Sequence, residues 1–212
     1  MSTLLSVQTG HPLSLPHADG QWLSSIHKRP VGTPLQLDHL NLEGDEQADL
    51  TVHGGPDKSV CAYSADHFAY WQATLRRPDL GPGAFGENFT VSGLDEATVC
   101  LGDVFAVGTA LVEVSQPRSP CWKLGRKWDR LDLPKLVLRA GKTGWYFRVR
   151  QPGQVAAGQE IRLVERPYAQ WTIDEVNRVA YAKKTGDMLA ARRELASCPA
   201  LSEAWRVDLA VG

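Results

Sequence analysis

Apolar residues along this chain occur in short runs that glycine, proline and polar residues interrupt. Such runs predict strands at residues 3–9, 21–27, 35–42, 60–63, 104–107, 110–114, 144–149 and 160–164. The segment 35–42 alternates between apolar and polar residues, as a half-buried strand does. Residues 11–20, which contain prolines and a glycine, are expected to form a loop. Many short strands with irregular turns indicate a mainly β, barrel-like domain rather than a parallel βαβ sheet.

Helical spacing occurs in two places within the first 166 residues. Ser64 is suited to cap a helix in which aromatic residues recur from His67 to Trp71. We interpret this aromatic stripe as core packing and not as a cofactor site. A second helix is predicted at residues 135–140, where Gly141 ends it.

The character of the sequence changes after residue 166. Thr172 and Glu175 form a capping box that begins a helix with an apolar face. Two more short helices are predicted, at residues 187–196 and from about Ser202. The chain is therefore expected to comprise two parts: a β-barrel-like domain over residues 1–166 and a small three-helix extension over residues 167–212.

Composition and charge narrow the function classes. The 212 residues are 43% hydrophobic and 22% charged, with a net charge of −1, which suits one sizeable domain with an appendage. This balance gives no reason to expect nucleic-acid binding. We interpret the cations of the extension as a solvated face and not as part of a DNA-binding helix-turn-helix; they are Lys183, Lys184, Arg192 and Arg193.

The lack of a recognisable targeting signal and the spacing of the cysteines predict a cytoplasmic protein. No apolar run approaches the roughly 18 residues of a membrane span, and no secretory signal begins the chain. The four cysteines are widely spaced and include no C-x-x-C pair, which argues against a disulfide framework or a structural zinc site. A reduced, cytoplasmic protein is expected.

The segment SQPRSPCWKL, residues 115–124, is the strongest candidate for a functional loop. Pro117 and Pro120 withdraw two backbone donors, so we expect the segment neither to continue as a central strand nor to become a helix. Arg118 and Lys123 flank Cys121, and positive charge nearby favours the thiolate, which is a nucleophile and a soft-metal ligand. The alternative is that Cys121 is a buried, small apolar residue, as most free cysteines are.

Polar residues in three other turns are weaker candidates. Lys28 and Arg29 precede a proline and are either solvated surface or phosphate contacts. His53 and Lys58 flank a Gly-Gly-Pro turn, where glycine lets the backbone approach a ligand; the alternative for His53 is a turn histidine bonded to nearby backbone. Asn88 could form hydrogen bonds with an amide-bearing ring of a ligand, or it could simply be part of a turn.

Three separate motifs of this sequence resemble motifs of a known family. The segments VHGGPDKSV, FGENF and VSQPRSPCWKL occur in this order, and a G-x-x-x-x-G-Q-E-I strand pair follows them. The chain resembles the MOSC family, named for the C-terminal domain of molybdenum-cofactor sulfurases, and most of all its stand-alone bacterial YiiM-type members. The resemblance covers about residues 5–165 and extends weakly through the C-terminal helices, which look like the three-helix extension of those proteins.

The resemblance implies a MOSC-type mixed β-barrel that binds molybdenum as its pyranopterin cofactor. It implies that Cys121 supplies a thiolate to the metal, a choice that soft-ligand chemistry supports. At the level of the whole family it also allows pyridoxal phosphate binding. The residues expected to contact the molybdenum cofactor are Arg118, Ser119 and Ser115 on the pterin side, His53, Lys58 and Asn88 from other loops, and Lys28, Arg29 and Lys123 at the phosphate.

The activity that the resemblance implies is the two-electron reduction of N-hydroxylated bases such as 6-hydroxylaminopurine, which yields the amine and water. His53 is the expected proton donor, because an imidazole titrates near neutral pH. The sequence carries no flavin or haem signature, so the electrons would come from a separate flavoprotein.

Three alternatives and a dimer stay open. Cys121 could hold a persulfide in a sulfur carrier, because the same thiolate would serve. The barrel could bind and store the cofactor without turnover. A thiol-redox or regulatory protein whose helices bind nucleic acid is a third reading. Trp171 and Trp205 are expected to be exposed aromatics that would permit a homodimer.

Overall fold

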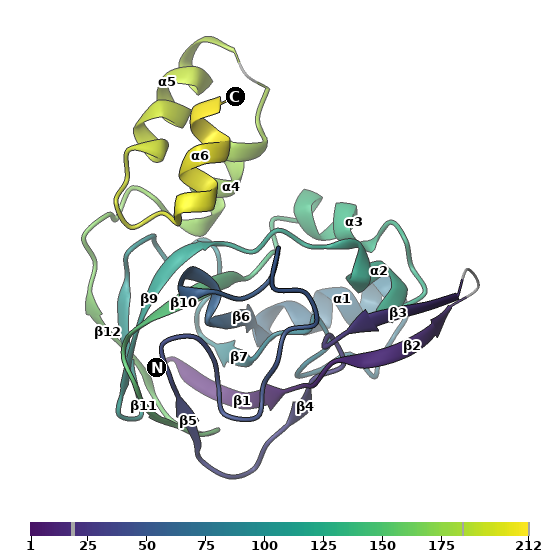
Figure 1. Ribbon diagram of the computed structural model, residues 1–212. Coiled ribbons are helices and arrows are strands. Elements are labelled where there is room, and N and C mark those ends of the chain that lie inside the picture. Colours follow the sequence, from purple (N-terminus) through teal and green to yellow (C-terminus); the bar gives the residue numbers. More distant parts are fainter. Residues whose placement is uncertain (18–19, 184, 212) are drawn as a thin grey trace.

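A curved sheet of eight strands forms the centre of the computed structural model, which describes residues 1–17, 20–183 and 185–211. In chain order the strands are β1 (Thr3–Thr9), β4 (Arg29–Pro30), β6 (Val60–Ser64), β7 (Phe89–Ser92), β8 (Val104–Val107), β9 (Ala110–Pro117), β10 (Trp145–Gln151) and β12 (Ile161–Glu165). Their order across the sheet is β12-β8-β9-β10-β6-β7-β1-β4, and the sheet curls into a half-barrel (Figure 1). All neighbours are antiparallel except β6 and β7. The predicted mainly β, barrel-like fold with α-helices is confirmed.

Two smaller strand pairs extend the half-barrel. They are β2 (Leu13–His17) with β3 (Gly20–Ser24), and β5 (Leu35–Leu37) with β11 (Gly153–Val155). The β2–β3 pair projects from one end of the sheet (Figure 1). The prediction of a loop at residues 11–20 was therefore wrong, because Leu13 to His17 pair with β3 despite Pro16. The strand predicted at residues 35–42 is confirmed only over its first three residues.

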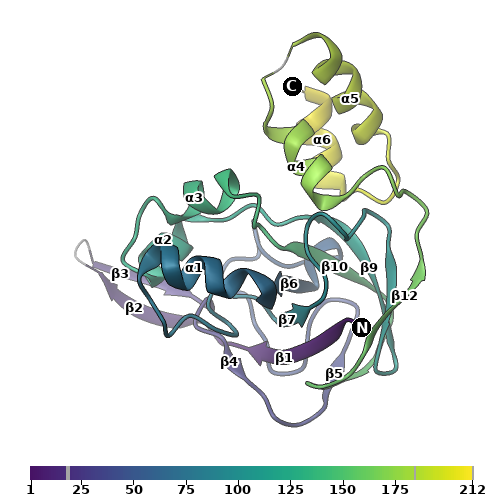
Figure 2. The same cartoon turned by 180° about the vertical axis from the view of Figure 1, so that it is seen from behind.

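Helices cover two regions of the sheet. α1 (Phe68–Leu75), α2 (Trp122–Lys127) and α3 (Leu133–Arg139) lie together near the β2–β3 pair (Figure 2). The short helix η2 (Ala65–His67) leads into α1, and the Ser64 hydroxyl accepts a hydrogen bond from the Asp66 N–H at its start, as predicted. Trp71 of α1 is fully buried against Phe85, which confirms that the aromatic stripe packs in the core.

The C-terminal residues form the three predicted helices, α4 (Ile173–Tyr181), α5 (Gly186–Ala196) and α6 (Glu203–Val211), above the β9–β10 end of the sheet (Figure 1). The Thr172 hydroxyl accepts a hydrogen bond from the Glu175 N–H and caps α4, as its capping box predicts. Val176 and Leu195 belong to the same buried cluster as Val112 of β9, so the extension shares the core of the barrel. The division at residue 166 stays a prediction.

Two expectations about the C-terminal extension were wrong, and a third concerns a residue outside the described part of the chain. Trp171 is buried, and Trp205 packs partly buried against the core, so neither supplies an exposed aromatic for a dimer. Arg192 is buried too, and its Nη1 donates to the Ala180 carbonyl at 2.7 Å. Lys184 lies outside the described residues. The dimer stays a prediction without this support.

The path of the chain around Cys121 differs from the prediction. β9 continues through Ser115 and Gln116 to Pro117, which pairs with Trp145 of β10 in the middle of the sheet. Pro117 has no backbone N–H to donate, but it is the last residue of β9. The hydrogen bonding between β9 and β10 therefore loses only its final donor. Cys121 is the N-cap of α2, which begins directly after it, since Pro120 lies outside the helix and cannot break it.

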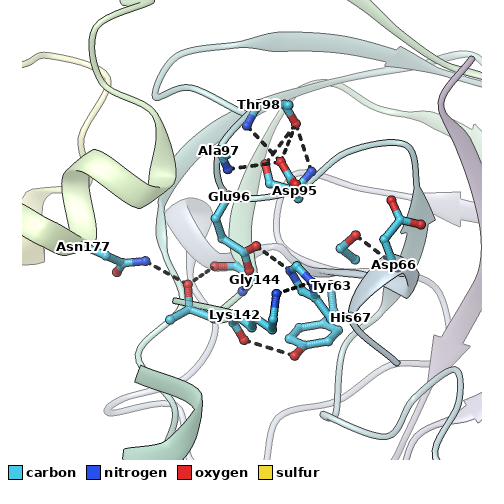
Figure 3. Close-up of polar contacts among 12 residues, drawn as sticks. Tyr63, Asp66, His67, Asp95, Glu96, Ala97, Thr98, Lys142, Gly144 and Asn177 are labelled. Atoms are coloured by element: carbon cyan, nitrogen blue, oxygen red, sulfur yellow. Dashed lines mark hydrogen bonds and ion pairs between the residues drawn. The ribbon is translucent and has the colours of Figure 1, made fainter. Parts of the chain in front are cut away.

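A buried polar network joins α1, α4 and the start of β10 (Figure 3). Glu96 is its centre: its carboxylate lies 2.6 Å from the His67 Nε2 and accepts a hydrogen bond from the Gly144 N–H at 2.6 Å. Lys142 Nζ lies 3.2 Å from the other ring nitrogen of His67. The Gly144 carbonyl in turn accepts the backbone N–H of Arg118 at 3.0 Å. The network therefore holds the backbone from which Arg118 projects.

Candidate functional site

A pocket opens beside the start of α2, where several stretches that are separate in the sequence meet. It encloses about 680 Å³, counting the open space at its mouth. The lining residues predicted from the sequence are Lys28, His53, Lys58, Asn88, Arg118, Ser119, Cys121 and Lys123. Among the other lining residues are Ser25, Glu46, Gln47, Cys61 and Tyr146. Eight of the ten predicted site residues are thus brought to one place.

Cys121 lies half-buried in the wall of this pocket. Its thiol makes no capping hydrogen bond to α2, and it forms no disulfide. Arg118 and Lys123 line the same pocket. The structure therefore keeps the thiol available to a ligand and surrounds it with positive charge, in agreement with the chemistry expected from the sequence.

Arg118 places a buried guanidinium at the base of the pocket. Its Nη2 donates to the Phe85 carbonyl at 2.5 Å, whereas its buried Nη1 has no hydrogen-bond partner within the described residues. Burial disfavours the charged form, but the nearby side chains of Cys61, Tyr146 and Cys121 outweigh it and raise the pKa of Arg118. A buried donor without a partner is costly, so this cation is poised to bind an anionic or acceptor group.

Lys28 and Asn88 are held by a buried carboxylate, Asp45, that the sequence reading did not single out. Asp45 forms an ion pair with Lys28 and also accepts hydrogen bonds from the Gly10 N–H at 2.8 Å and from Asn88 Nδ2 at 2.9 Å. Asn88 Oδ1 accepts the backbone N–H of Cys61 at 3.1 Å. The side-chain amide of Asn88 is thus hydrogen-bonded to other parts of the protein and links three segments of the chain. Asp45 neutralises much of the charge of Lys28.

The turn that carries His53 and Lys58 forms the opposite side of the pocket. Lys58, at the end of the short helix η1 (Pro56–Lys58), donates from Nζ to the Val52 carbonyl at 3.0 Å. Burial lowers the pKa of His53 below its ordinary value of 6.5, and the charges of Lys123, Lys58 and Arg118 lower it further. The imidazole is consequently neutral near pH 7 while no anion is bound.

A titration of the ligand-free protein tests this assignment of His53. We expect its imidazole to titrate below pH 6.5 in NMR spectra and to move upward when inorganic phosphate binds among the cations. Because the pKa of His53 is lowered in the folded chain, the unfolded chain binds a proton at a higher pH than the folded chain does. His53 should therefore reduce the free energy of unfolding as the pH falls below 6.5. Urea unfolding of His53→Gln should therefore show a smaller loss of stability between pH 7 and pH 5 than the wild type. A midpoint at or above 6.5 would contradict the assignment.

Cys61 and Tyr146 are among the pocket residues that sequence reasoning missed. Tyr146 pairs with Cys61 across β10 and β6, so both side chains lie on the face of the sheet that forms the pocket. Burial raises the pKa of the Cys61 thiol to about 11 and also raises the pKa of Tyr146, whose hydroxyl hydrogen-bonds that thiol. Both strands were predicted from the apolar pattern. Their register, which brings these two residues together, carries no local signal.

Two predicted site residues lie outside the pocket. Ser115 is fully buried, and its hydroxyl lies 2.6 Å from the Asp57 carbonyl oxygen and 3.1 Å from that of Tyr146. It bridges β9 to η1 and does not face the pocket. Arg29 is exposed on β4 and lies at a neighbouring hollow with Lys127 and Trp128. The structure thus places these two residues apart from the other eight, and their contact with a cofactor stays a prediction.

Two features are absent from the described residues. No helix in that part of the chain is long and apolar enough to cross a membrane. Across the same residues, no group of three or more His, Cys, Asp or Glu side chains could hold a metal ion.

Comparison with known proteins identifies two matching families and several relatives. Residues 49–162 match the MOSC domain, and residues 171–207 match the YiiM-like, 3-alpha helix domain. Protein YiiM from Escherichia coli (strain K12) is 42% identical over 188 residues, which cover 86% of this chain and 81% of that protein. A protein named Reductase from Gibberella moniliformis is 37% identical over 177 residues, which cover 81% of this chain but only 31% of that protein. The crystal structure of YiiM from Geobacillus stearothermophilus matches with a TM-score of 0.84 and 39% identity, and the match covers 100% of this chain and 98% of that one.

Proposed function

Because this chain belongs to the MOSC family, we propose that it binds the molybdenum cofactor and reduces N-hydroxylated compounds such as 6-hydroxylaminopurine. The observation that carries the proposal is the pairing of a free thiol, Cys121, with the buried guanidinium of Arg118, whose Nη1 has no partner in the described part of the chain. Similarity to a protein named Reductase supports the reaction class.

The residues of the pocket fit this cofactor chemically. A molybdenum cofactor brings its own dithiolene sulfurs, so a single protein thiolate from Cys121 suffices, and a cluster of protein ligands is unnecessary. Arg118, Lys123 and Lys58 would hold the anionic parts of the cofactor by charge-assisted hydrogen bonds, and Ser119 would add a hydroxyl. Pyridoxal phosphate would suit the same cations but would give Cys121 no role. We therefore favour the molybdenum cofactor.

When bound, the cofactor supplies the two-electron redox chemistry. The overall reaction converts R–NHOH, two electrons and two protons into R–NH2 and water. The chain itself must hold the substrate near Cys121 and deliver protons. His53 suits the second task, because a bound anion beside Lys123 and Lys58 offsets the charges that lower its pKa.

An external flavoprotein is the proposed source of electrons, because the sequence carries no flavin or haem signature. The pocket has an open mouth, through which both substrate and electrons can reach it. A chemical reductant such as reduced viologen can replace this partner in an assay.

Molybdenum analysis and a turnover assay test the proposed function together. Protein from a host that makes the cofactor is expected to contain near-stoichiometric molybdenum and to convert 6-hydroxylaminopurine to adenine with reduced viologen. Molybdenum without turnover would favour cofactor storage. A persulfide on Cys121 without molybdenum would favour a sulfur carrier.

A further inference from the structure

The C-terminal helices contact the pocket at Ser119. The Ser119 hydroxyl, which lines the pocket, lies 3.1 Å from the hydroxyl of Tyr181, the last residue of α4. Pro117 and Pro120 flank Ser119 and limit where its backbone can go. An aromatic side chain from the extension therefore lies at the rim of the pocket, although it is distant from the other pocket residues in the sequence.

The ring of Tyr181 is held in place but is not covered. Trp205 of α6 packs edge-on against it, with ring centroids 6.3 Å apart and an angle of 84°. The buried Arg192 donates to the carbonyl of Ala180 and so fixes the end of α4. Tyr181 nevertheless keeps 52% of its surface exposed. A rigid, half-exposed aromatic ring with a polar tip is suited to recognise a planar ligand at low entropic cost.

The extension is also attached to β9, and through Arg148 of β10 to η1. The Ser202 N–H donates to the Ser115 carbonyl at 3.0 Å, at the end of β9 that leads to the pocket. Arg148 donates to the Ala200 carbonyl at 3.0 Å and pairs with Asp57 of η1, the neighbour of Lys58, at 2.8 Å. Because the extension is anchored by these contacts, Tyr181 keeps a set position relative to Cys121.

We propose that Tyr181 is a specificity-determining residue that selects planar, nitrogen-containing ring substrates by stacking at the pocket rim. This inference rests on the proposed function and adds to it a residue that favours substrates with a ring over those without one. Small N-hydroxylated compounds without a ring gain nothing from Tyr181, whereas a purine gains one aromatic contact.

Four forms of the cofactor-loaded full chain test the proposal: wild type, Tyr181→Leu, Tyr181→Phe and Tyr70→Leu. Tyr70 is the matched control, because it is 45% exposed on α1 and does not line the pocket. Calorimetry gives the Kd of 6-hydroxylaminopurine, and steady-state assays give kcat and KM for that base and for N-hydroxyurea. Tyr181→Leu should raise the Kd and KM of the base about tenfold, with kcat and the KM of N-hydroxyurea unchanged. Tyr181→Phe keeps the ring and should stay within about threefold of wild type.

If Tyr181→Leu and Tyr70→Leu had the same Kd and KM for 6-hydroxylaminopurine, the role of Tyr181 would be overturned. An equal rise in the KM of both substrates in Tyr181→Leu would overturn it too. The binding measurement separates this result from failure of the proposed function. If the wild type turned over neither substrate, the reductase proposal would fail, while the Kd of the base would still report whether Tyr181 recognises the ring.

Discussion

Cys121→Ser is expected to lose bound molybdenum and to reduce turnover of 6-hydroxylaminopurine more than about 100-fold. Groups that only support metal ligands are worth about 10–100-fold, so loss of a ligand itself should cost more. A serine hydroxyl is neutral at pH 7 and is a hard ligand, which a soft metal site accepts poorly. The measurements are elemental analysis for molybdenum and the viologen-linked assay.

The fold should survive this change, because the Cys121 side chain is half-buried and makes no capping hydrogen bond to α2. Cys198→Ser is the matched control. Cys198 is buried between α5 and α6 and does not line the pocket, so this variant should keep its molybdenum. Cys121→Ser with full molybdenum and full turnover would show that the thiol is not the metal ligand.

Asp45→Asn is expected to lower the free energy of unfolding by about 3–5 kcal/mol, the usual cost of removing one partner from a buried ion pair. The side chains of Asp45 and Lys28 are 0% and 8% exposed, so water cannot replace the lost charge. One carboxylate oxygen faces Lys28 and the Gly10 N–H, and the other faces the amide nitrogen of Asn88. An asparagine has one acceptor oxygen, so either orientation points a donor at another donor.

Urea unfolding measures this loss, and Glu46→Gln is the matched control. Glu46 is the next residue and is exposed, and its contact with His11 at 3.4 Å is exposed at both ends. Its replacement should change stability by less than about 0.5 kcal/mol. If the two variants were equally stable, Asp45 would not be the buried support of Lys28 and Asn88 that the contacts indicate.

Local sequence was sufficient for features that depend on neighbouring residues. The short apolar runs gave most strands of the sheet, and the Thr172–Glu175 capping box gave the start of α4. The composition of residues 115–124 marked Cys121 and Arg118 as residues of one site, and both line the pocket. The strands and the start of α4 were predicted correctly because backbone preference and capping act over a few residues, whereas the roles of Cys121 and Arg118 stay a prediction.

Tertiary structure alone decided which polar groups remain available to a ligand. Asn88 lies 43 residues from Asp45, which takes its amide nitrogen, and Ser115 is turned toward η1 and away from the pocket. The pairing of β6 with β10 brings Cys61 beside Tyr146, and α4 brings Tyr181 to Ser119 across 62 residues. A side chain is most available to a ligand when distant residues leave some of its hydrogen-bonding capacity unused. Strand register and helix packing determine that condition, and the sequence around each residue does not encode it.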